Sequence, residues 1–120
     1  MPGVLEPAGT PEDSEAVGPL DHLGLIPAED GCSYVGVAVP AGILTSRQLS
    51  ELASAGCHEL RLTPRQNVLI ASLPSSALKM ALQRVTEAGL TADADDWAGC
   101  VETCTGIEFC RRAVVETKAV

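Results

Sequence analysis

Two cysteines near the C-terminus have the type and spacing that most clearly indicate chemistry. Cys104 and Cys110 bracket the short sequence TGIEF, and the stretch Trp97–Lys118 holds three of the five cysteines of this 120-residue chain. A turn through Gly106 would let both sulfurs face the same point. Residues 107–117 contain no proline or glycine, so we expect them to form a helix, whose N-terminal N–H groups and dipole favour nearby thiolates. This pattern predicts half of a metal or iron–sulfur site, because such a site takes about four ligands.

Two other interpretations of these cysteines stay open. Each could be a buried free thiol that packs as a small hydrophobic side chain. A zinc site built from Cys100, Cys104, Cys110 and His58 is the second alternative, although the C-x2-C spacing of zinc knuckles is absent.

A second group of polar side chains lies where a predicted strand ends. Residues 59–63, ELRLT, alternate polar and apolar, and a bend comes after them. The candidate binding residues are Arg61, Thr63, Arg65, Gln66 and Asn67. Two guanidinium groups, a hydroxyl and two amides presented together could hold several carboxylates, since arginine pairs bidentately and stays charged. The same residues also fit a solvated strand face that leads into a polar turn.

The elements that must position these groups are predicted by hydrophobic periodicity. Alternating valines predict a strand at residues 33–40, and Thr45 with Gln48 has capping-box spacing at the start of a helix. Strands at 59–63 and 67–73 and a helix from Pro74 to Gly89 come next. The order β-α-β-β-α predicts an α+β, ferredoxin-like half-domain with a C-terminal cysteine-bearing helix. A complete unit needs another strand, which we expect from residues 91–103 or from elsewhere.

Composition and charge exclude several classes of function. The net charge is −8, with 16 acidic against 8 basic residues, so we expect no nucleic-acid partner. There is no apolar run of about 18 residues and no secretory signal pattern, so we expect no membrane span and a cytoplasmic protein with reduced thiols. We expect residues 1–19 to be a disordered acidic leader, 20–96 a ferredoxin-like half-domain, and 97–120 the start of a further domain.

Five stretches together resemble one family, the sirohaem-dependent nitrite and sulfite reductases. They are DHLGL at 21–25, YVGVAVPAGILTSRQLSELA at 34–53, ELRLTPRQNVLI at 59–70, VTEAGL at 85–90 and CTGIEFCRRAVVETK at 104–118. The CTG-x-x-FC…ETK segment preceded by RLT-x-x-QN carries most of the specificity.

The resemblance implies cofactors, a reaction and partners. It implies that Cys104 and Cys110 are two thiolate ligands of a 4Fe-4S cluster. It also implies that the five polar residues of 61–67 lie towards sirohaem. Such enzymes reduce nitrite to ammonia or sulfite to sulfide with six electrons from a ferredoxin-type donor, and the metal centres carry that chemistry.

The chain departs from the family in its cysteine content beyond Cys110. Family members have a second C-x3-C pair of cysteines, and the sequence after Cys110 contains none. We therefore expect a truncated chain or fragment that binds both cofactors only together with the remaining portion of the reductase or a complementary chain. The alternatives are a non-catalytic half-domain that binds a tetrapyrrole or a partner, and a fragment of a related cobalamin-pathway (precorrin-3B) synthase.

Overall fold

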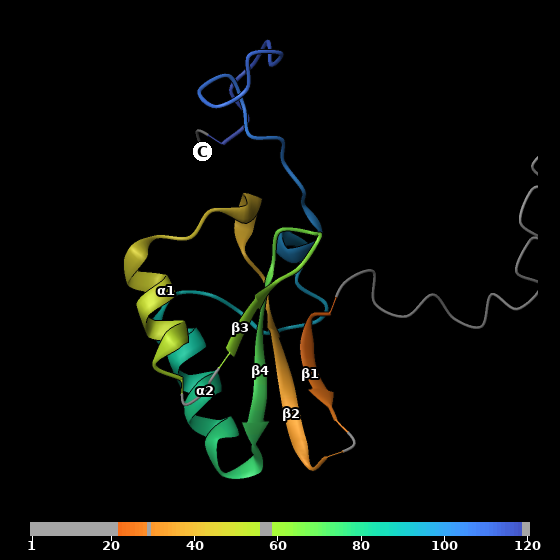
Figure 1. Cartoon of the computed structure of the whole chain (residues 1–120), viewed down its shortest axis with the longest axis vertical. Helices are drawn as coiled ribbons and strands as arrows, with labels where there is room; N and C mark the ends of the chain where they lie inside the picture. Colours follow the sequence, from red (N-terminus) through yellow and green to blue (C-terminus); the bar gives the residue numbers. More distant parts are fainter. Residues whose placement is uncertain (1–21, 29, 56–58, 119–120) are drawn as a thin grey trace, which may run out of the picture.

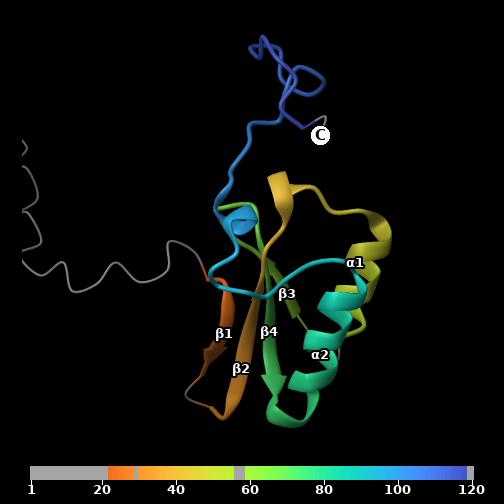
Figure 2. The same ribbon diagram turned by 180° about the vertical axis from the view of Figure 1, so that it is seen from behind.

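An antiparallel sheet with two helices on one face forms the body of the molecule (Figures 1 and 2). The computed structural model describes residues 22–28, 30–55 and 59–118. The predicted leader at 1–19, and Cys57 and His58, lie outside the described residues. None of the helices formed by the described residues is long and apolar enough to cross a bilayer.

Within the described residues, four strands, two α-helices and two short 3-10 turns succeed one another. They are β1 (Gly24–Pro27), β2 (Cys32–Val37), η1 (Pro40–Gly42), α1 (Ser46–Ala53), β3 (Glu59–Leu62), β4 (Val68–Pro74), α2 (Ser75–Glu87) and η2 (Trp97–Cys100). The sheet order is β1-β2-β4-β3, and β4 pairs antiparallel with both β2 and β3. Strands β2 and β3 are therefore parallel to each other with β4 between them, which is the split βαβ arrangement. The predicted α+β, ferredoxin-like half-domain is confirmed.

The additional strand comes from the N-terminal side of the predicted unit. Residues Gly24–Pro27 pair with β2 from Gly24 opposite Gly36 to Pro27 opposite Ser33. A tight turn makes this pairing possible, because Ala28 N–H donates to the Cys32 carbonyl at 3.1 Å. Within residues 91–103, the other expected source of this strand, only Thr91 forms a β-bridge, to Ala38.

The core lies between the sheet and the two helices. Val35, Val37 and Val39 face the helices as their alternation predicts, and Val68 and Ile70 of β4 lie beside them; all are at most 2% exposed. The side chains that the helices add to this core are those of Leu52, Ala81 and Val85. The predicted capping box is confirmed, since Gln48 N–H donates to Thr45 Oγ1 and Thr45 N–H donates to Gln48 Oε1.

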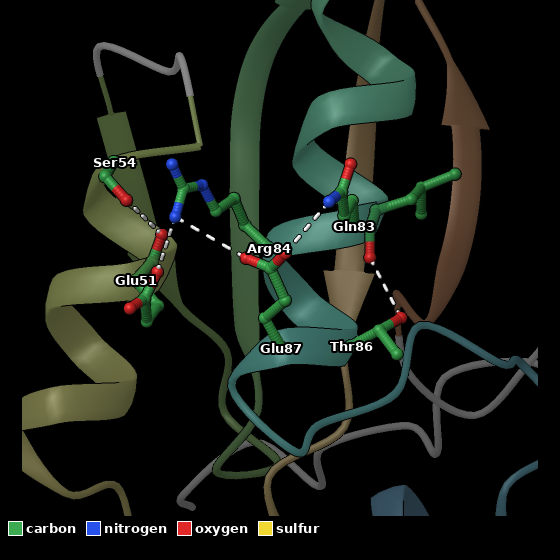
Figure 3. A network of polar contacts seen from close by, with 7 residues as sticks. Glu51, Ser54, Gln83, Arg84, Thr86 and Glu87 are labelled. Carbon is green, nitrogen blue, oxygen red and sulfur yellow. Dashed lines mark hydrogen bonds and ion pairs between the residues drawn. The ribbon is translucent and has the colours of Figure 1, made fainter.

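Polar contacts tie the two helices together on their outer side (Figure 3). Arg84 of α2 donates to Glu51 of α1 at 3.1 Å and to Glu87 at 3.5 Å. Gln83 donates to the same Glu87 at 2.9 Å. All these side chains are at least partly exposed, so the network contributes little to stability.

The predicted helix at residues 107–117 is wrong. This segment forms isolated turns, in which the Phe109 and Cys110 N–H groups both donate to the Gly106 carbonyl. A helix in a protein is stabilised chiefly by burying an apolar face, and here Phe109 is 75% exposed and Val114 88% exposed. The segment instead lies beyond one end of the sheet, past η1 and away from the β3–β4 turn (Figure 1).

Candidate functional site

The turn between β3 and β4 is shaped by its own hydrogen bonds. Thr63 N–H donates to the Asn67 carbonyl at 2.9 Å, and Gln66 N–H donates to the Thr63 carbonyl at 3.1 Å. The Thr63 hydroxyl accepts from Asn67 N–H at 3.2 Å. The last loop residue, Gln66, has φ of +65°, the left-handed position that closes such short hairpin loops. The bend that the sequence predicts at Pro64 is thus a compact hairpin turn.

The two amide side chains of this turn are bound by the protein itself. Asn67 is 1% exposed; its Oδ1 accepts from Val39 N–H at 2.9 Å and its Nδ2 donates to the Gly99 carbonyl at 2.8 Å. Gln66 Nε2 donates to the Thr103 carbonyl at 2.7 Å, and Gln66 Oε1 accepts from Thr103 N–H at 3.2 Å. Both residues therefore connect the sheet end to the segment that carries the cysteines.

The two arginines lie at the surface, each with a carboxylate. Arg61 Nε contacts Glu59 Oε1 at 2.6 Å, and Arg65 Nη1 contacts Glu102 Oε1 at 3.2 Å. The hydrogen bond from Arg61 lowers the pKa of Glu59 below its ordinary value, and the same contact raises the pKa of Arg61. Exposed pairs of this kind contribute little to stability.

A shallow hollow of about 250 Å³ lies beside Arg61 on the sheet face away from the helices. Its lining also includes Tyr34 and Leu69, which alternate with the core residues of β2 and β4. Arg61 thus opens onto this face, whereas Arg65 reaches Glu102 in the cysteine-bearing segment. The structure does not bring the two guanidinium groups to one shared partner.

The predicted turn through Gly106 is confirmed, and it arranges the backbone around Cys104. Gly106 has φ of +79° and its N–H donates to Cys104 Sγ at 3.2 Å. This positive φ favours glycine, and a Cβ at this position would lie 2.5 Å from Glu116 Oε1, so that the Glu116 side chain would have to shift. Cys104 is exposed and Cys110 is half-buried, and the four described cysteines are free. Within the described part of the chain, no three His, Cys, Asp or Glu side chains are grouped to hold a metal ion.

Four further residues hold the cysteine segment in place, and the sequence pattern did not reveal them. Thr103 Oγ1 and Lys118 Nζ both donate to the Ala41 carbonyl, at 2.9 and 2.5 Å, and Thr117 Oγ1 donates to the Cys104 carbonyl at 2.7 Å. Thr117 and Lys118 belong to the ETK triplet at 116–118, which stands out in the sequence only as part of a family resemblance. No spacing in the sequence signals a contact between residues 41 and 103.

Comparison with known proteins gives a consistent result. An assimilatory ferredoxin-dependent nitrite reductase of Haloferax mediterranei is 36% identical to this chain, covering 93% of the chain and 19% of the reductase. A sulfite reductase [ferredoxin] 2 of Mycolicibacterium paratuberculosis is 32% identical, covering 83% and 19%. The solved structure of the Mycobacterium tuberculosis NirA protein superimposes with a TM-score of 0.68 at 31% identity, covering 79% of this chain and 18% of that one.

The matches cover most of this chain but only a small part of each relative. The chain spans about a fifth of the length of the curated relatives it matches. Residues 26–88 match the family described as the nitrite/sulfite reductase ferredoxin-like half domain. That range runs from within β1 to just beyond α2. The chain therefore belongs to the family of the nitrite/sulfite reductase ferredoxin-like half domain.

Proposed function

We propose that this chain forms part of a reductase of nitrite or sulfite that contains sirohaem and a 4Fe-4S cluster. Its half-domain would hold sirohaem carboxylates, and Cys104 and Cys110 would supply two thiolate ligands to the cluster. The observation that carries the proposal is the Gly106 turn, which places a backbone N–H 3.2 Å from Cys104 Sγ, in the segment that follows the matched half-domain of residues 26–88. The relatives' names make a ferredoxin the natural electron donor, and the free described cysteines suit the reducing cytoplasm.

The chemistry around Cys104 fits a cluster thiolate. A thiolate is stabilised by N–H donors, and hydrogen bonds to cluster sulfurs also tune the reduction potential. The Gly106 N–H is such a donor, and Thr117 Oγ1 lies 3.9 Å from the same sulfur. Cys110 belongs to the same turn, because its N–H donates to the Gly106 carbonyl at 3.0 Å. In this proposal the turn presents both thiols as part of one ligand set.

The polar residues of 61–67 divide into two groups in their fit to sirohaem. Arg61 and Arg65 have exposed carboxylate partners that a sirohaem carboxylate could replace, since bidentate arginine–carboxylate pairing is strong. Thr63, Gln66 and Asn67 would shape the turn that presents the arginines, because their polar groups already bond within the protein. In this proposal the two arginines would face the tetrapyrrole, and the other three residues would hold the turn that presents them.

The cofactors, when bound, would supply the electron transfer and the metal-centred reduction of the anion. The residues of this chain would bind and orient them. The remaining portion of the reductase, or a complementary chain, would complete the cluster ligands. The relatives cited above are named as reductases of nitrite and of sulfite, so they favour a reductase over the cobalamin-pathway synthase.

Metal content in a completed protein tests this proposal. The chain would be co-expressed with the portion of the Haloferax mediterranei reductase that it does not cover. Iron, acid-labile sulfide and visible absorption would then be measured, together with reduction of nitrite and sulfite. We expect cluster and haem absorption that is lost in Cys104→Ser and Cys110→Ser and retained in Cys32→Ser. Absence of iron from the completed protein, or iron content unaffected by Cys104→Ser, would overturn the assignment.

A non-catalytic half-domain that binds a tetrapyrrole is the second candidate. The surface position of Arg61 beside a hollow favours it, because the isolated chain already exposes this guanidinium. Titrating sirohaem into the isolated chain separates the two functions. Binding that Arg61→Ala weakens, with no reductase activity in the completed protein, would select this candidate. Binding that Arg61→Ala leaves unchanged would exclude a role for Arg61 in either function.

A further inference from the structure

Thr103, the residue directly before Cys104, has every hydrogen-bonding group engaged by the end of the sheet. Gln66 Nε2 donates to its carbonyl at 2.7 Å, and its N–H donates to Gln66 Oε1 at 3.2 Å. Its hydroxyl donates to the Ala41 carbonyl at 2.9 Å. One side chain and one carbonyl, from loops far away in the sequence, thus fix both peptide groups and the hydroxyl of a single residue.

Both residues that hold Thr103 have a backbone conformation that L-residues rarely adopt. Ala41 has φ of +53° and Gln66 has φ of +65°. The two loops also lie in contact, since a Cβ on Gly42 would be 2.7 Å from Gln66 Cβ. Non-glycine residues with positive φ are uncommon, persist only where their surroundings hold them, and gather at functional sites. Here both residues with positive φ form hydrogen bonds with the same residue, Thr103.

The same set of contacts continues past Thr103 to the cysteine. The Cys104 carbonyl accepts from Thr117 Oγ1 at 2.7 Å, and Cys104 Sγ accepts from Gly106 N–H at 3.2 Å. The Thr103 carbonyl belongs to the peptide bond that leads into Cys104, so the peptide groups on both sides of this cysteine are fixed. Cys104 itself stays exposed. The backbone is therefore held while the thiol remains open to a ligand.

We propose that Gln66 and Ala41 are positioning residues for the Cys104 thiol. Gln66 acts through its carboxamide and Ala41 acts through its carbonyl, and both act by fixing Thr103. The inference rests on the proposed function only in taking Cys104 as a ligand of the cluster. A ligand that is already oriented binds without the free-energy cost of ordering it, so the half-site is prepared before any metal arrives.

A pair of glycine variants separates positioning from backbone strain. Glycine accepts positive φ, so Ala41→Gly and Gln66→Gly both relieve strain. Ala41→Gly keeps the carbonyl that Thr103 binds, whereas Gln66→Gly removes the carboxamide. We expect the Thr103 N–H to exchange with solvent about tenfold faster in Gln66→Gly, as loss of a hydrogen bond allows. We expect its exchange to be unchanged in Ala41→Gly.

Site-resolved alkylation of the metal-free chain gives the readout at the thiol. Iodoacetamide pulses followed by peptide mapping report Cys104 and, as an internal reference at the far end of β2, Cys32. We expect Gln66→Gly to change the alkylation rate of Cys104 and not that of Cys32. The matched control is Gln83→Ala, which removes a carboxamide that donates to the exposed Glu87 at 2.9 Å. It should change neither rate.

Two milder variants test the same inference if Gln66→Gly folds poorly. Gln66→Glu keeps the acceptor for Thr103 N–H but places a carboxylate against the Thr103 carbonyl, so protection should fall. Thr103→Val removes only the hydroxyl contact to Ala41 and should loosen residues 103–106 less than Gln66→Glu does. Equal Thr103 protection in the wild type, Gln66→Gly and Gln66→Glu would overturn the inference, as would equal loosening by Ala41→Gly.

These measurements distinguish a failure of the positioning role from a failure of the proposed function. Loss of Thr103 protection in Gln66→Gly supports positioning even if the completed protein binds no iron. Conversely, a completed protein that binds iron equally well with wild-type Gln66 and with Gln66→Glu would keep the proposed function and overturn the positioning role.

Discussion

Asn67 donates through Nδ2 to the carbonyl of Gly99 at 2.8 Å, in a buried contact between residues 32 positions apart. The Oδ1 atom of the same side chain accepts from Val39 N–H at 2.9 Å. One buried carboxamide therefore joins the residue before η1 to η2, and η2 leads into the cysteine-bearing segment. Gly99 itself packs closely against its neighbours, since a Cβ there would lie 2.5 Å from Leu23 Cδ1 and 3.0 Å from Ala38 Cβ.

Asn67→Asp should be strongly destabilising although it barely changes the shape of the side chain. The variant keeps the acceptor for Val39 N–H, but it loses the donor to Gly99 and buries a carboxyl group. We expect the free energy of unfolding to fall by about 2–4 kcal/mol at neutral pH. Urea denaturation of the metal-free chain measures this. Gln83→Glu, the same change of amide to carboxylate at an exposed position, should cost at most a few tenths; an equal loss in both variants would contradict the role of burial.

Gly36 should not tolerate even a methyl group. A Cβ at this position would lie 1.6 Å from the His22 carbonyl oxygen and 2.7 Å from Leu23 Cα, so the segment that enters β1 would have to move off the sheet. We expect Gly36→Ala to lower the free energy of unfolding by about 1–3 kcal/mol through overpacking. It should also increase hydrogen exchange in β1, which pairs with β2 at this residue. Unchanged exchange in β1 would show that the backbone adapts without displacing the strand.

Much of the half-domain is predictable from local pattern alone. The valines of β2 alternate, the Thr45–Gln48 capping box marks the start of α1, and Gly89 ends the second helical pattern with φ of +71°. Each of these signals depends on residues within a few positions of one another. Local interactions of this kind can be read from one sequence, because propensity and side-chain period decide them.

The rest depends on contacts that are distant in the sequence. β1 is only four residues long, and its pairing with β2 creates it. Residues 107–117 have helical composition, but without a partner surface the described segment stays in turns. The sequence predicts Gln66 and Asn67 as ligand-binding amides. In the structure the Gln66 carboxamide bonds to residue 103 and the Asn67 carboxamide bonds to residue 99. A bonding partner more than 30 positions away leaves no local pattern.

Burial, not apolar character, should decide how much each leucine of α1 contributes to the free energy of unfolding. Leu52 is 0% exposed in the core, while Leu49 is 47% exposed one turn earlier. We expect Leu52→Ala to lower the free energy of unfolding by about 2–5 kcal/mol because it leaves a cavity. Leu49→Ala, the control on the same helix, should stay within about 0.5 kcal/mol of the wild type. Thermal denaturation of both variants checks this, and similar losses would mean that α1 packs on a different face.

The pKa of Glu59 should report whether Arg61 is hydrogen-bonded to it. The hydrogen bond from Arg61 lowers the pKa of Glu59 from its usual 4.5, with the charge of Arg61 acting in the same direction. A lowered carboxyl pKa stabilises the fold at pH values above the unfolded pKa, and that contribution is lost as the pH falls through the folded pKa. We expect Arg61→Gln to raise the pKa of Glu59 towards 4.5. Carboxyl NMR shifts followed through an acid titration measure it.

The same titration connects this pair to the proposed binding of a tetrapyrrole. If a sirohaem carboxylate replaces Glu59 on Arg61, the pKa of Glu59 should rise in the wild type when sirohaem is added, and it should not respond in Arg61→Gln. Arg84→Gln is the matched control, because Arg84 contacts Glu51 and Glu87 instead. High salt should reduce the difference between wild type and Arg61→Gln, since both groups are exposed. A Glu59 pKa that sirohaem leaves unchanged in a protein that binds it would place the tetrapyrrole away from Arg61.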